Sequence, residues 1–446
     1  MPLRLLIAGL VVLLLTISFA PDLQAVPASP REFVVGYSAQ GRPISAVQFG
    51  DGPRKLVVVG NTHGAPEANT YRLTLALIEH LRANPQLVPP SVRLFLVPTV
   101  NPDGIALGWR FDAAGVDLNR NMNTNLDACP ENDWRTTVQG AYGIISDTGG
   151  AYPDSQVEAQ LVRAFLLDAA GAIFLHSNAG LVFPAACEHG PSIRLAEVYA
   201  QAASYEYRRF WSLYHITGGM HDWAGSLGIA AITPELVTGD QMEFAENLAA
   251  LTAVLAQADE LLPLPEDGEV AGFNVPAPIF RYWRALGGEE RFGLPLEEAR
   301  TTSSGISQTF AHARISLTHA QRDTLFYVQP DPLGVAAAAA LAYGGAEAQL
   351  PHPTQPEAGL YFPESGFSLN GGFRDLWQRG GGLAVFGLPL SHEFQASSSA
   401  TPRTLQYFER ALFSYSPAEG VRLEALGARQ LALEGLMQPE AVQMVR

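Results

Sequence analysis

Short apolar runs alternate with amphipathic stretches between residues 31 and 262, and this alternation constrains the fold more than any other feature of the chain. The apolar runs have the length of buried strands and comprise Leu56–Val59, Leu94–Val97 and Ile173–Leu175. The amphipathic stretches carry apolar residues every three or four positions, and they comprise Tyr71–Leu81, Ser155–Leu167 and Phe244–Leu261. The alternation predicts an α/β domain in which helices cover a sheet.

The composition narrows the class of protein. At the usual ~100–200 residues per domain, a chain of 446 residues predicts about two to four domains. Hydrophobic residues make up 47% and charged residues 16%, which excludes a disordered or coiled-coil chain. The formal net charge of -16 repels phosphate backbones and anionic lipids. This charge argues against nucleic acid as a partner and favours small molecules, peptides or polymers.

The first residues have the pattern of a secretory signal peptide. Arg4 precedes the apolar run Leu5–Ala20 and a small residue ends the stretch that follows, so we expect residues 1–25 to be removed on export. The alternative is a membrane anchor, for which the run is short. No later segment predicts a transmembrane span, so the expected location is secreted, extracellular or associated with the cell envelope. In an oxidising compartment Cys129 and Cys187 could form a disulfide, which their spacing leaves open.

The last third of the chain contains an internal repeat. Residues Trp283, Gly287, Gly288 and Phe292–Leu296 recur as Trp377, Gly381, Gly382 and Phe386–Leu390. A proline-rich acidic stretch before the repeat predicts a linker. We expect a smaller β-rich region, divided into a linker at 263–272, a first repeat module at 273–330, a low-complexity spacer at 331–364 and a second module at 365–435. The units resemble LGFP-type repeats, which implies attachment to a cell-wall or surface polymer. The alternative is that the shared residues are core and turn residues only.

His63 and Glu67 follow the strand Leu56–Val59 and open onto a predicted helix. Zinc binds imidazole nitrogen and carboxylate oxygen, and one Glu and two His with an open position form a catalytic site. His176 also follows an apolar run and is the candidate third ligand. The alternatives are a surface ion pair or helix cap for the first two residues and a buried structural role for His176. The sequence has no His-Glu-x-x-His motif, which excludes a zincin type of site.

Five motifs occur one after another between residues 32 and 260. They are Thr99–Gly104, Gly115–Asn121, Leu175–Ser177, Tyr214 with Asp222–Trp223, and Thr233–Leu236. In this order they resemble the motifs of zinc metallocarboxypeptidases of the carboxypeptidase A/B superfamily, peptidase family M14. The resemblance implies a catalytic domain at 31–262 with a carboxypeptidase-like, phosphorylase/hydrolase-like fold, in which helices flank a mixed central sheet.

The resemblance assigns a chemical role to each matching residue. His63, Glu67 and His176 would hold one Zn2+ per chain, and Asp117 would orient a metal-bound imidazole. Glu235 would be the general base, which takes a proton from water and later delivers it to the leaving amine.

Further residues match the oxyanion and substrate positions of the family. Arg110 would stabilise the oxyanion. Asn119 and Arg120 would clamp the terminal carboxylate of a substrate, because a planar guanidinium binds a carboxylate in a bidentate way. Tyr214 would close over the substrate. Ser177 and His221 complete the predicted substrate-binding set.

The chain departs from the family pattern at two places. Relatives have His-x-x-Glu, whereas Glu67 here is four residues after His63 and Pro66 takes the third place. We expect a turn at Gly64 to absorb the extra residue; without that turn, two histidines alone would hold zinc weakly. The position that helps to select the terminal side chain in relatives is His221, which argues against a preference for basic side chains. The alternative is that His221 points away from the pocket.

Three functions are compatible with these residues. The leading one is a zinc metallocarboxypeptidase that removes C-terminal residues from peptides. The second is a murein peptide amidase that cuts γ-D-glutamyl bonds of peptidoglycan stem peptides. The third is a non-catalytic surface-binding protein with a degenerate zinc site. Activity on muropeptides would identify the second function, and lack of metal the third.

Overall fold

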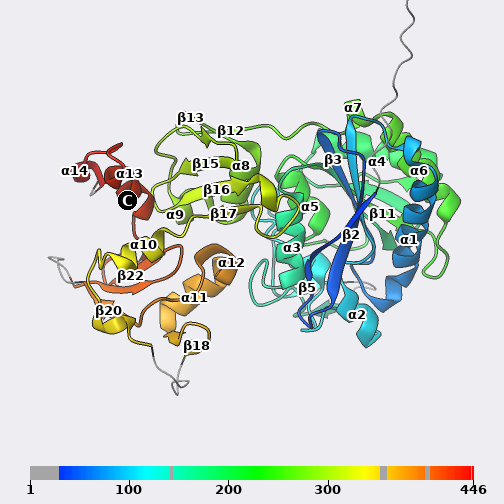
Figure 1. The fold of residues 1–446 in the computed structure, drawn as a ribbon. Helices are drawn as coiled ribbons and strands as arrows, with labels where there is room; N and C mark the ends of the chain where they lie inside the picture. Colours follow the sequence, from blue (N-terminus) through cyan, green and yellow to red (C-terminus); the bar gives the residue numbers. More distant parts are fainter. Residues whose placement is uncertain (1–29, 141–143, 352–358, 397–401, 443, 446) are drawn as a thin grey trace, which may run out of the picture.

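The structure is a computed structural model that describes residues 30–140, 144–351, 359–396, 402–442 and 444–445. The predicted signal peptide at 1–25 lies outside these residues. Figure 1 shows an α/β part, up to about residue 262, beside a part built of short strands and helices. In the described part of the chain, no helix combines the length and the apolar character needed to cross a membrane.

A nine-stranded mixed sheet forms the centre of the α/β part. The strands, in spatial order, are β1 (Arg31–Tyr37), β2 (Pro43–Phe49), β4 (Val92–Val97), β3 (Arg54–Val59), β7 (Ala169–Phe174), β11 (Ala230–Leu236), β9 (Leu181–Pro184) and β10 (Glu206–Tyr207), with β8 (His176–Ser177) beside β11. The central strands β4, β3, β7 and β11 run parallel to one another. Their carboxyl ends therefore meet at one edge of the sheet, where α/β proteins bind ligands.

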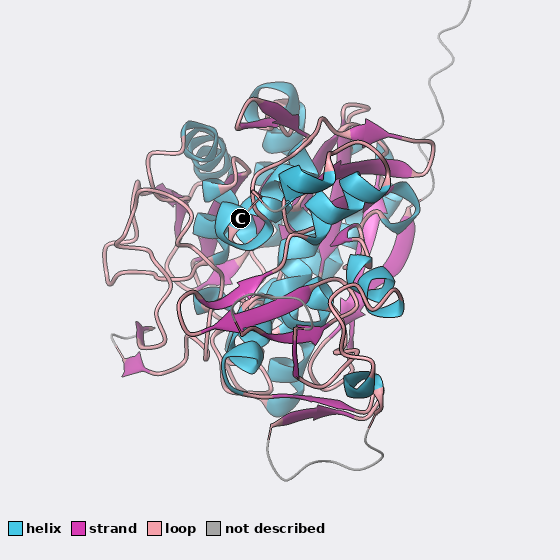
Figure 2. Cartoon of the chain, turned by 90° about the vertical axis from the view of Figure 1, so that its left-hand side faces the viewer, coloured by secondary structure: helices cyan, strands magenta, loops and turns pink. Residues whose placement is uncertain are grey.

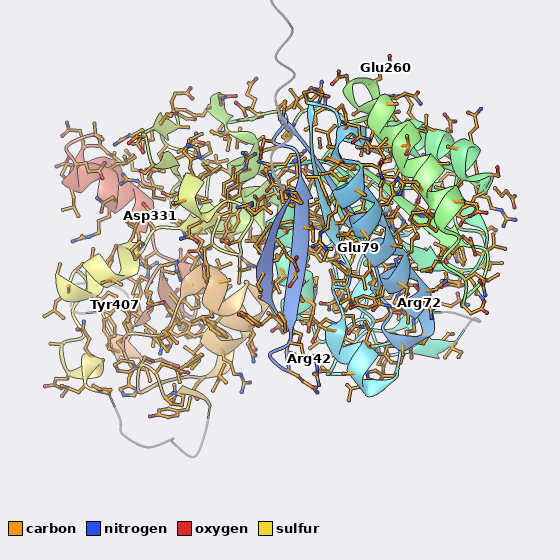
Figure 3. All side chains as sticks on the ribbon, turned by 45° about the vertical axis from the view of Figure 1, so that its right-hand side comes forward. Arg42, Arg72, Glu79, Glu260, Asp331 and Tyr407 are labelled. Carbon is orange, nitrogen blue, oxygen red and sulfur yellow. A yellow bond between two sulfur atoms is a disulfide. The ribbon has the colours of Figure 1, made fainter. Side chains whose placement is uncertain are left out.

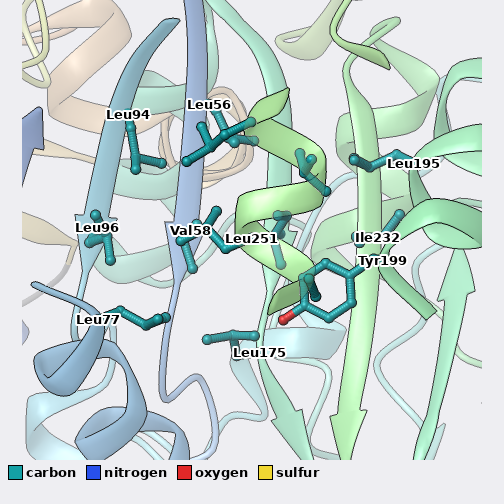
Figure 4. Packing of buried hydrophobic residues seen from close by; sticks show 14 of the residues in the cluster. Leu56, Val58, Leu77, Leu94, Leu96, Leu175, Leu195, Tyr199, Ile232 and Leu251 are labelled. Atoms are coloured by element: carbon teal, nitrogen blue, oxygen red, sulfur yellow. The ribbon is translucent and has the colours of Figure 1, made fainter. Parts of the chain in front are cut away.

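Helices cover both faces of this sheet. The helices on one face are α1 (Ala68–Ala83), α4 (Gly190–Ala203) and α6 (Phe244–Ala256), and those on the other are α3 (Val157–Leu166) and α5 (Met220–Ser226). Leu56 and Val58 of β3 pack into the first core (Figure 4), while Val57 and Val59 pack into the second. Because alternate side chains of a strand point to opposite faces, a strand covered on both sides is an uninterrupted apolar run.

The predicted fold class is confirmed, and two of the three predicted helices form with shifted ends. The predicted helix Tyr71–Leu81 is α1, which is longer at both ends, and the predicted helix Ser155–Leu167 is α3, which is shorter at both ends. The prediction of one helix over Phe244–Leu261 is wrong. The chain leaves the helical region at Gln257, with φ −112° and ψ 19°, and continues as a separate short helix α7 (Ala258–Leu261). This break turns the apolar residues of α7 into the first core.

The second part contains two copies of one fold unit, seen from their outer side in Figure 2. Each copy has a hairpin, two helices and a four-stranded antiparallel sheet. The first comprises β12 (Gly268–Val270), β13 (Phe273–Val275), α8 (Ala277–Ala285), α9 (Gly288–Phe292), β14 (Arg300–Thr301), β15 (Gly305–Thr309), β16 (Arg314–Thr318) and β17 (Val328–Pro330). The second comprises β18 (Leu360–Phe362), β19 (Phe367–Leu369), α11 (Gly371–Arg379), α12 (Gly382–Phe386), β20 (Phe394–Gln395), β21 (Thr404–Tyr407), β22 (Leu412–Ser416) and β23 (Gly420–Leu423).

The residues that recur in the sequence occupy equivalent places in the two copies. The indole Nε1 of Trp283 donates to the Gly293 carbonyl and that of Trp377 to the Gly387 carbonyl, both at 3.0 Å. These glycines have φ of 75° and 77°, a region that favours glycine. The phenylalanine that opens each Phe-Gly-Leu-Pro run is 2% exposed. The repeated residues therefore act as core and turn residues.

Two boundaries predicted from composition are wrong. Residues 268–270, which the prediction gives to a linker, form β12. The predicted spacer at 331–364 contains β18 and a helix, α10 (Leu333–Ala339). The alanines that suggest low complexity are small side chains, which allow α10 to approach another backbone closely.

The helices that follow the two sheets are exchanged between the copies. α10 packs on the second copy, where Val335 N donates to Glu409 O at 3.0 Å. α13 (Leu426–Leu433) packs on the first copy, where Ala428 N donates to Ala311 O at 3.1 Å. A Cβ at Gly334 would collide with the carbonyl oxygen of Phe408 in the second copy, so this close approach requires glycine. The chain after α10 is bound as well, through the hydroxyl of Tyr407 (Figure 3), which accepts from Tyr343 N at 3.0 Å.

Candidate active site and metal centre

Three of the predicted site residues lie at the carboxyl edge of the sheet. His63 is four residues beyond the end of β3, and His176 opens β8 just after β7. Glu235 lies in β11 and is paired in register with His176. Parallel strands thus bring together side chains that are far apart in the sequence.

Glu67 reaches His63 despite the longer spacing. The expected turn at Gly64 is present, with φ 48°, and a short 3-10 helix over Ala65–Glu67 follows it. A Cβ at Gly64 would collide with the carbonyl oxygen of Trp109, so this turn requires glycine. The turn absorbs the extra residue, and Glu67 Oε1 lies 2.6 Å from His63 Nδ1.

The three predicted ligands converge on one buried point. His176 Nδ1 lies 3.0 Å from Glu67 Oε2 and 3.1 Å from His63 Nδ1. The three residues are at most 4% exposed, and one donor atom from each lies within 4.8 Å of the others. Two imidazole nitrogens and a carboxylate oxygen are the ligands of catalytic zinc sites. The residues therefore fit a zinc ion.

The charges of the neighbours prepare these ligands for a cation. Burial alone would raise the pKa of Glu67, but His63 and His176 lower it below its usual range, so the carboxylate stays ionised. Asp117 Oδ1 lies 3.0 Å from His63 Nε2. Burial opposes ionisation of Asp117 too, and Arg110 and His63 hold its pKa well below the usual value. His63 thus lies between two carboxylates, with Nε2 towards Asp117 and Nδ1 towards Glu67, and Arg110 Nη2 lies 2.8 Å from Nε2. When Nδ1 binds a metal, Asp117 can accept the proton of Nε2 and orient the ring.

Arg110 and Glu235 lie beside this cluster. Arg110 Nε donates to Asp117 Oδ2 at 3.0 Å, and its Nη1 lies 3.5 Å from Glu67 Oε1, so the guanidinium is fixed. Burial raises the pKa of Glu235 to about 7; His176 opposes this shift and Glu67 adds to it. A carboxyl group with a pKa near neutrality can both accept and release a proton.

The predicted carboxylate clamp lies next to the cluster. Asn119 Oδ1 accepts from Met220 N at 2.9 Å, which directs its amide nitrogen to His176 Nε2 at 3.4 Å. Arg120 is 1% exposed and donates to the Asn119 carbonyl at 2.7 Å. Its guanidinium lies 5.7 Å from the centre of the Tyr214 ring. The structure therefore brings Asn119, Arg120 and Tyr214 together.

The remaining two predicted substrate residues differ from each other in their surroundings. His221 is 2% exposed, and its ring lies edge-on to Phe183 at 5.1 Å. Among the described residues its Nδ1 has no hydrogen-bond partner. Ser177 Oγ instead donates to Asn69 Oδ1 at 3.0 Å, and its backbone N donates to Glu67 Oε2 at 3.4 Å. These contacts favour a supporting role for Ser177 over a substrate contact.

The sequence left open whether Cys129 and Cys187 pair. In the structure they form a disulfide with a Cα–Cα distance of 5.7 Å. The bond joins the segment after Arg120 to the chain before α4. Asp127 lies near the two sulfur atoms. Since both sulfurs are in the disulfide, this group does not have the thiolates of a metal site.

The sequence analysis did not single out Asn69. Besides accepting from Ser177, its Nδ2 donates to the carbonyls of Thr238 at 2.8 Å and Gln241 at 3.0 Å. It therefore connects the helix that follows Glu67 with the loop after β11. The available signal was a polar residue two positions after Glu67, on the side of the helix predicted to be buried.

Comparison with known proteins identifies similar chains. The family described as zinc carboxypeptidase, Peptidase M14, matches residues 23–267. Murein peptide amidase A of Escherichia coli strain K12 is 29% identical over 192 residues, which cover 40% of this chain and 69% of that protein. Carboxypeptidase SOL1 of Arabidopsis thaliana is 30% identical over 103 residues, 21% of each chain.

Solved structures are also similar to this chain over about half of its length. The structure of bovine thrombin-activatable fibrinolysis inhibitor with tick carboxypeptidase inhibitor has a TM-score of 0.45 and 19% identity, covering 52% of this chain and 91% of that one. Murein-tripeptide amidase MpaA from Escherichia coli O157 has a TM-score of 0.37 and 23% identity, covering 49% and 91%. The family match spans more than half of the chain and includes every predicted site residue. The chain therefore belongs to the zinc carboxypeptidase family, peptidase M14.

Proposed function

We propose that this protein is a zinc-dependent carboxypeptidase that removes single residues from the C-terminal ends of peptides. One observation carries the proposal: the buried cluster of His63, Glu67 and His176 lies beside Glu235, which pairs in register with His176, and beside Asn119, whose carbonyl accepts from the buried Arg120. A cation site beside an anion site suits a substrate whose scissile bond is one residue from a free carboxylate.

The residues around the cluster support peptide hydrolysis. Bound zinc supplies a Lewis acid that polarises a carbonyl and lowers the pKa of water. Glu235 takes the proton from the attacking water and delivers it to the leaving amine, for which a pKa near neutrality is suitable. Arg110 is held by Asp117 and places a fixed positive charge where the carbonyl oxygen becomes negative.

Selection for chain ends comes from the clamp. Arg120 and Asn119 bind the terminal carboxylate, since a guanidinium and an amide nitrogen both donate to carboxylate oxygens. Tyr214 lies over the Arg120 guanidinium and covers the terminal residue once it is bound. His221 is the residue from which a preference for the terminal side chain would come.

The test uses the chain from residue 26 and peptides that differ only in their C-terminal residue, read by mass spectrometry. Stepwise loss of the last residue is the expected result, abolished by a chelator and restored by zinc. Glu235→Gln is the matched control, because it removes the base and leaves the three ligands in place. Equal cleavage of peptides with a free and with a blocked C-terminal carboxylate would contradict the proposed role of Arg120.

Peptidoglycan peptides are the second candidate substrate class. The similarity to murein peptide amidase A favours it, because that protein matches across 69% of its own length. Purified muropeptides in the same assay separate the two functions. Release of a stem-peptide residue from muropeptides, without loss of residues from ordinary peptides, would favour the amidase. A chain without zinc after dialysis against the metal would instead favour a non-catalytic binding protein.

The proposed location is outside the cytoplasm, after removal of residues 1–25. The disulfide between Cys129 and Cys187 supports this location, because disulfides persist in oxidising compartments. Attachment of the repeats to a wall or surface polymer stays a proposal. Co-sedimentation of the repeat-containing chain with isolated cell walls tests it.

A further inference from the structure

The first repeat packs against the backbone of the catalytic part through a buried arginine of α8. Arg281 is 4% exposed and donates at 3.0 Å to the carbonyl of Leu227, the residue directly after α5. It also donates to the carbonyls of Leu167 at 3.1 Å and Ala169 at 2.7 Å. Figure 1 shows α8 next to α5. α5 is the helix that carries His221. The repeat therefore holds the end of a helix that contributes to the substrate site.

A second contact fixes the segment that follows the carboxylate clamp. Arg284 Nη2 donates to the Leu126 carbonyl at 2.9 Å. From the other side, Asn123 Nδ2 donates to the Ala285 carbonyl at 3.2 Å. Ala285 also belongs to the same buried cluster as two neighbours of the clamp, Leu118 and Met122. The repeat thus contributes to the core beneath the clamp.

A buried charge cluster joins the same two parts. Lys55 of β3 is fully buried, and its Nζ donates to Asp168 Oδ1 at 2.9 Å, to Asp323 Oδ1 at 2.8 Å and to the Phe165 carbonyl at 2.7 Å. Arg322 Nε donates to Asp168 Oδ2 at 2.9 Å. Arg322 and Asp323 come from the first repeat. A buried ammonium requires its carboxylates, so the repeat completes the environment of a residue in the catalytic sheet.

The second repeat provides an internal comparison. Counted from the shared tryptophan, the positions of Arg281, Arg284 and Ala285 are occupied by Asp375, Gln378 and Arg379. In addition, residues 319–327, which carry Arg322 and Asp323, join β16 to β17, whereas only residues 417–419 join β22 to β23. The second copy forms the same hairpin, helices and sheet with other residues at these positions, so the fold unit does not require Arg281 or Arg284. The first copy differs from the second where it meets the catalytic part.

We propose that the first repeat is a positioning element of the active site, which holds the segment after Arg120 and the end of α5 in the geometry that binds the substrate's terminal carboxylate. Arg284 is the positioning residue: it acts on substrate through the segment 121–127 and touches no predicted site residue. The nature of the substrate rests on the proposed carboxypeptidase function, whereas the positioning itself rests on the contacts of α8.

The test compares Arg284→Ala with Gln378→Ala, its counterpart in the second repeat, in the chain from residue 26. Loss of one hydrogen bond to a charged donor is expected to raise KM for peptides about fivefold, with kcat within about twofold of wild type. Amide hydrogen exchange within residues 121–127 should become faster in the same variant. Arg284→Lys keeps a donor, so its KM should lie between that of Arg284→Ala and that of wild type. Gln378→Ala should change neither KM nor the exchange rate within residues 121–127.

Unchanged KM together with unchanged exchange in Arg284→Ala would overturn the proposal, and so would equal changes in both variants. If Arg284→Ala does not fold, Asn123→Ala removes the companion hydrogen bond from the catalytic side and is read in the same way. A wild-type chain that hydrolyses no peptide would refute the proposed function. The exchange measurement alone would then decide whether the repeat positions the segment.

Discussion

Replacing Asp323 by Asn should destabilise the chain by about 2 kcal/mol, because the substitution weakens a charged hydrogen bond in the buried cluster. Asp323 is 4% exposed and accepts from Lys55 Nζ at 2.8 Å. A buried charge with no partner costs roughly 3 to 5 kcal/mol. Lys55 keeps Asp168 at 2.9 Å and the Phe165 carbonyl at 2.7 Å, so the smaller value applies.

The assay is thermal unfolding at neutral pH, followed by calorimetry. If the catalytic part and the first repeat unfold together as a unit of about 300 residues, a loss of about 2 kcal/mol lowers Tm by roughly 3 °C, since the entropy of unfolding is about 2.1 cal/mol/K per residue. Glu289→Gln is the matched control, because it removes an exposed carboxylate from the same repeat and should shift stability by less than about 0.5 kcal/mol. The shift should also survive added salt, since buried pairs are screened little.

Equal Tm values for Asp323→Asn and Glu289→Gln would refute the reasoning. They would mean that the carboxylate does not stabilise Lys55 in solution and that the first repeat is not held by this cluster. Two separate unfolding transitions in the wild type would lead to the same conclusion, because repeat and catalytic part would then unfold independently.

Three further predictions concern the site and the pH dependence. Glu235→Gln should lower kcat by about 10² to 10⁴, the usual contribution of a general base, with zinc content unchanged; full activity in a peptide assay would exclude it as the base. Asp117→Asn should weaken zinc binding by about 10- to 100-fold in a buffered metal titration, and unaltered affinity would contradict its contact with His63. Burial opposes ionisation of Asp168, but Lys55 and Arg93 lower its pKa below 3.8, so its stabilising effect is present above that pH and is lost as pH falls further. Asp168→Asn should therefore destabilise the chain at pH 7 and have little effect on Tm in strong acid. A Tm difference between wild type and variant that is the same at both pH values would refute this linkage.

The candidate site was predictable because its ligands follow apolar strands. His63 and His176 both come after buried runs, and the parallel order of β3, β7 and β11 places the ends of such runs at one edge. The contact of Glu67 with His63 depends on the backbone at Gly64, and glycine at that position was the available signal. The pKa of Glu235 could not be read from the sequence, because it depends on burial beside His176 and Glu67.

The organisation of the last third was less predictable because composition does not report long-range packing. The alanine-rich segment around α10 looks like a spacer, yet its small residues let the helix approach the second copy. The break between α6 and α7 at Gln257 could not be predicted, because no proline or glycine lies at that position. Both features come from tertiary contacts, which override local propensity.

A repeated unit nevertheless contains a signal that a single domain does not have. Some packing positions are the same in both copies, as for Trp283 and Trp377, and some core positions exchange one apolar residue for another, as for Ile279 and Phe373. A position that is charged and buried in one copy but exposed in the other is therefore a candidate for contacts outside the unit. The buried Arg281 faces the carbonyl groups of the catalytic part, whereas its counterpart Asp375 is exposed. In the sequence alone, an arginine on the polar side of a helix is read as an ordinary surface residue. Comparison of the two copies makes Arg281 a candidate for contact with the catalytic part. The contacts of Arg281, Arg284 and the Lys55 charge cluster thus make the first repeat best understood as part of the catalytic unit.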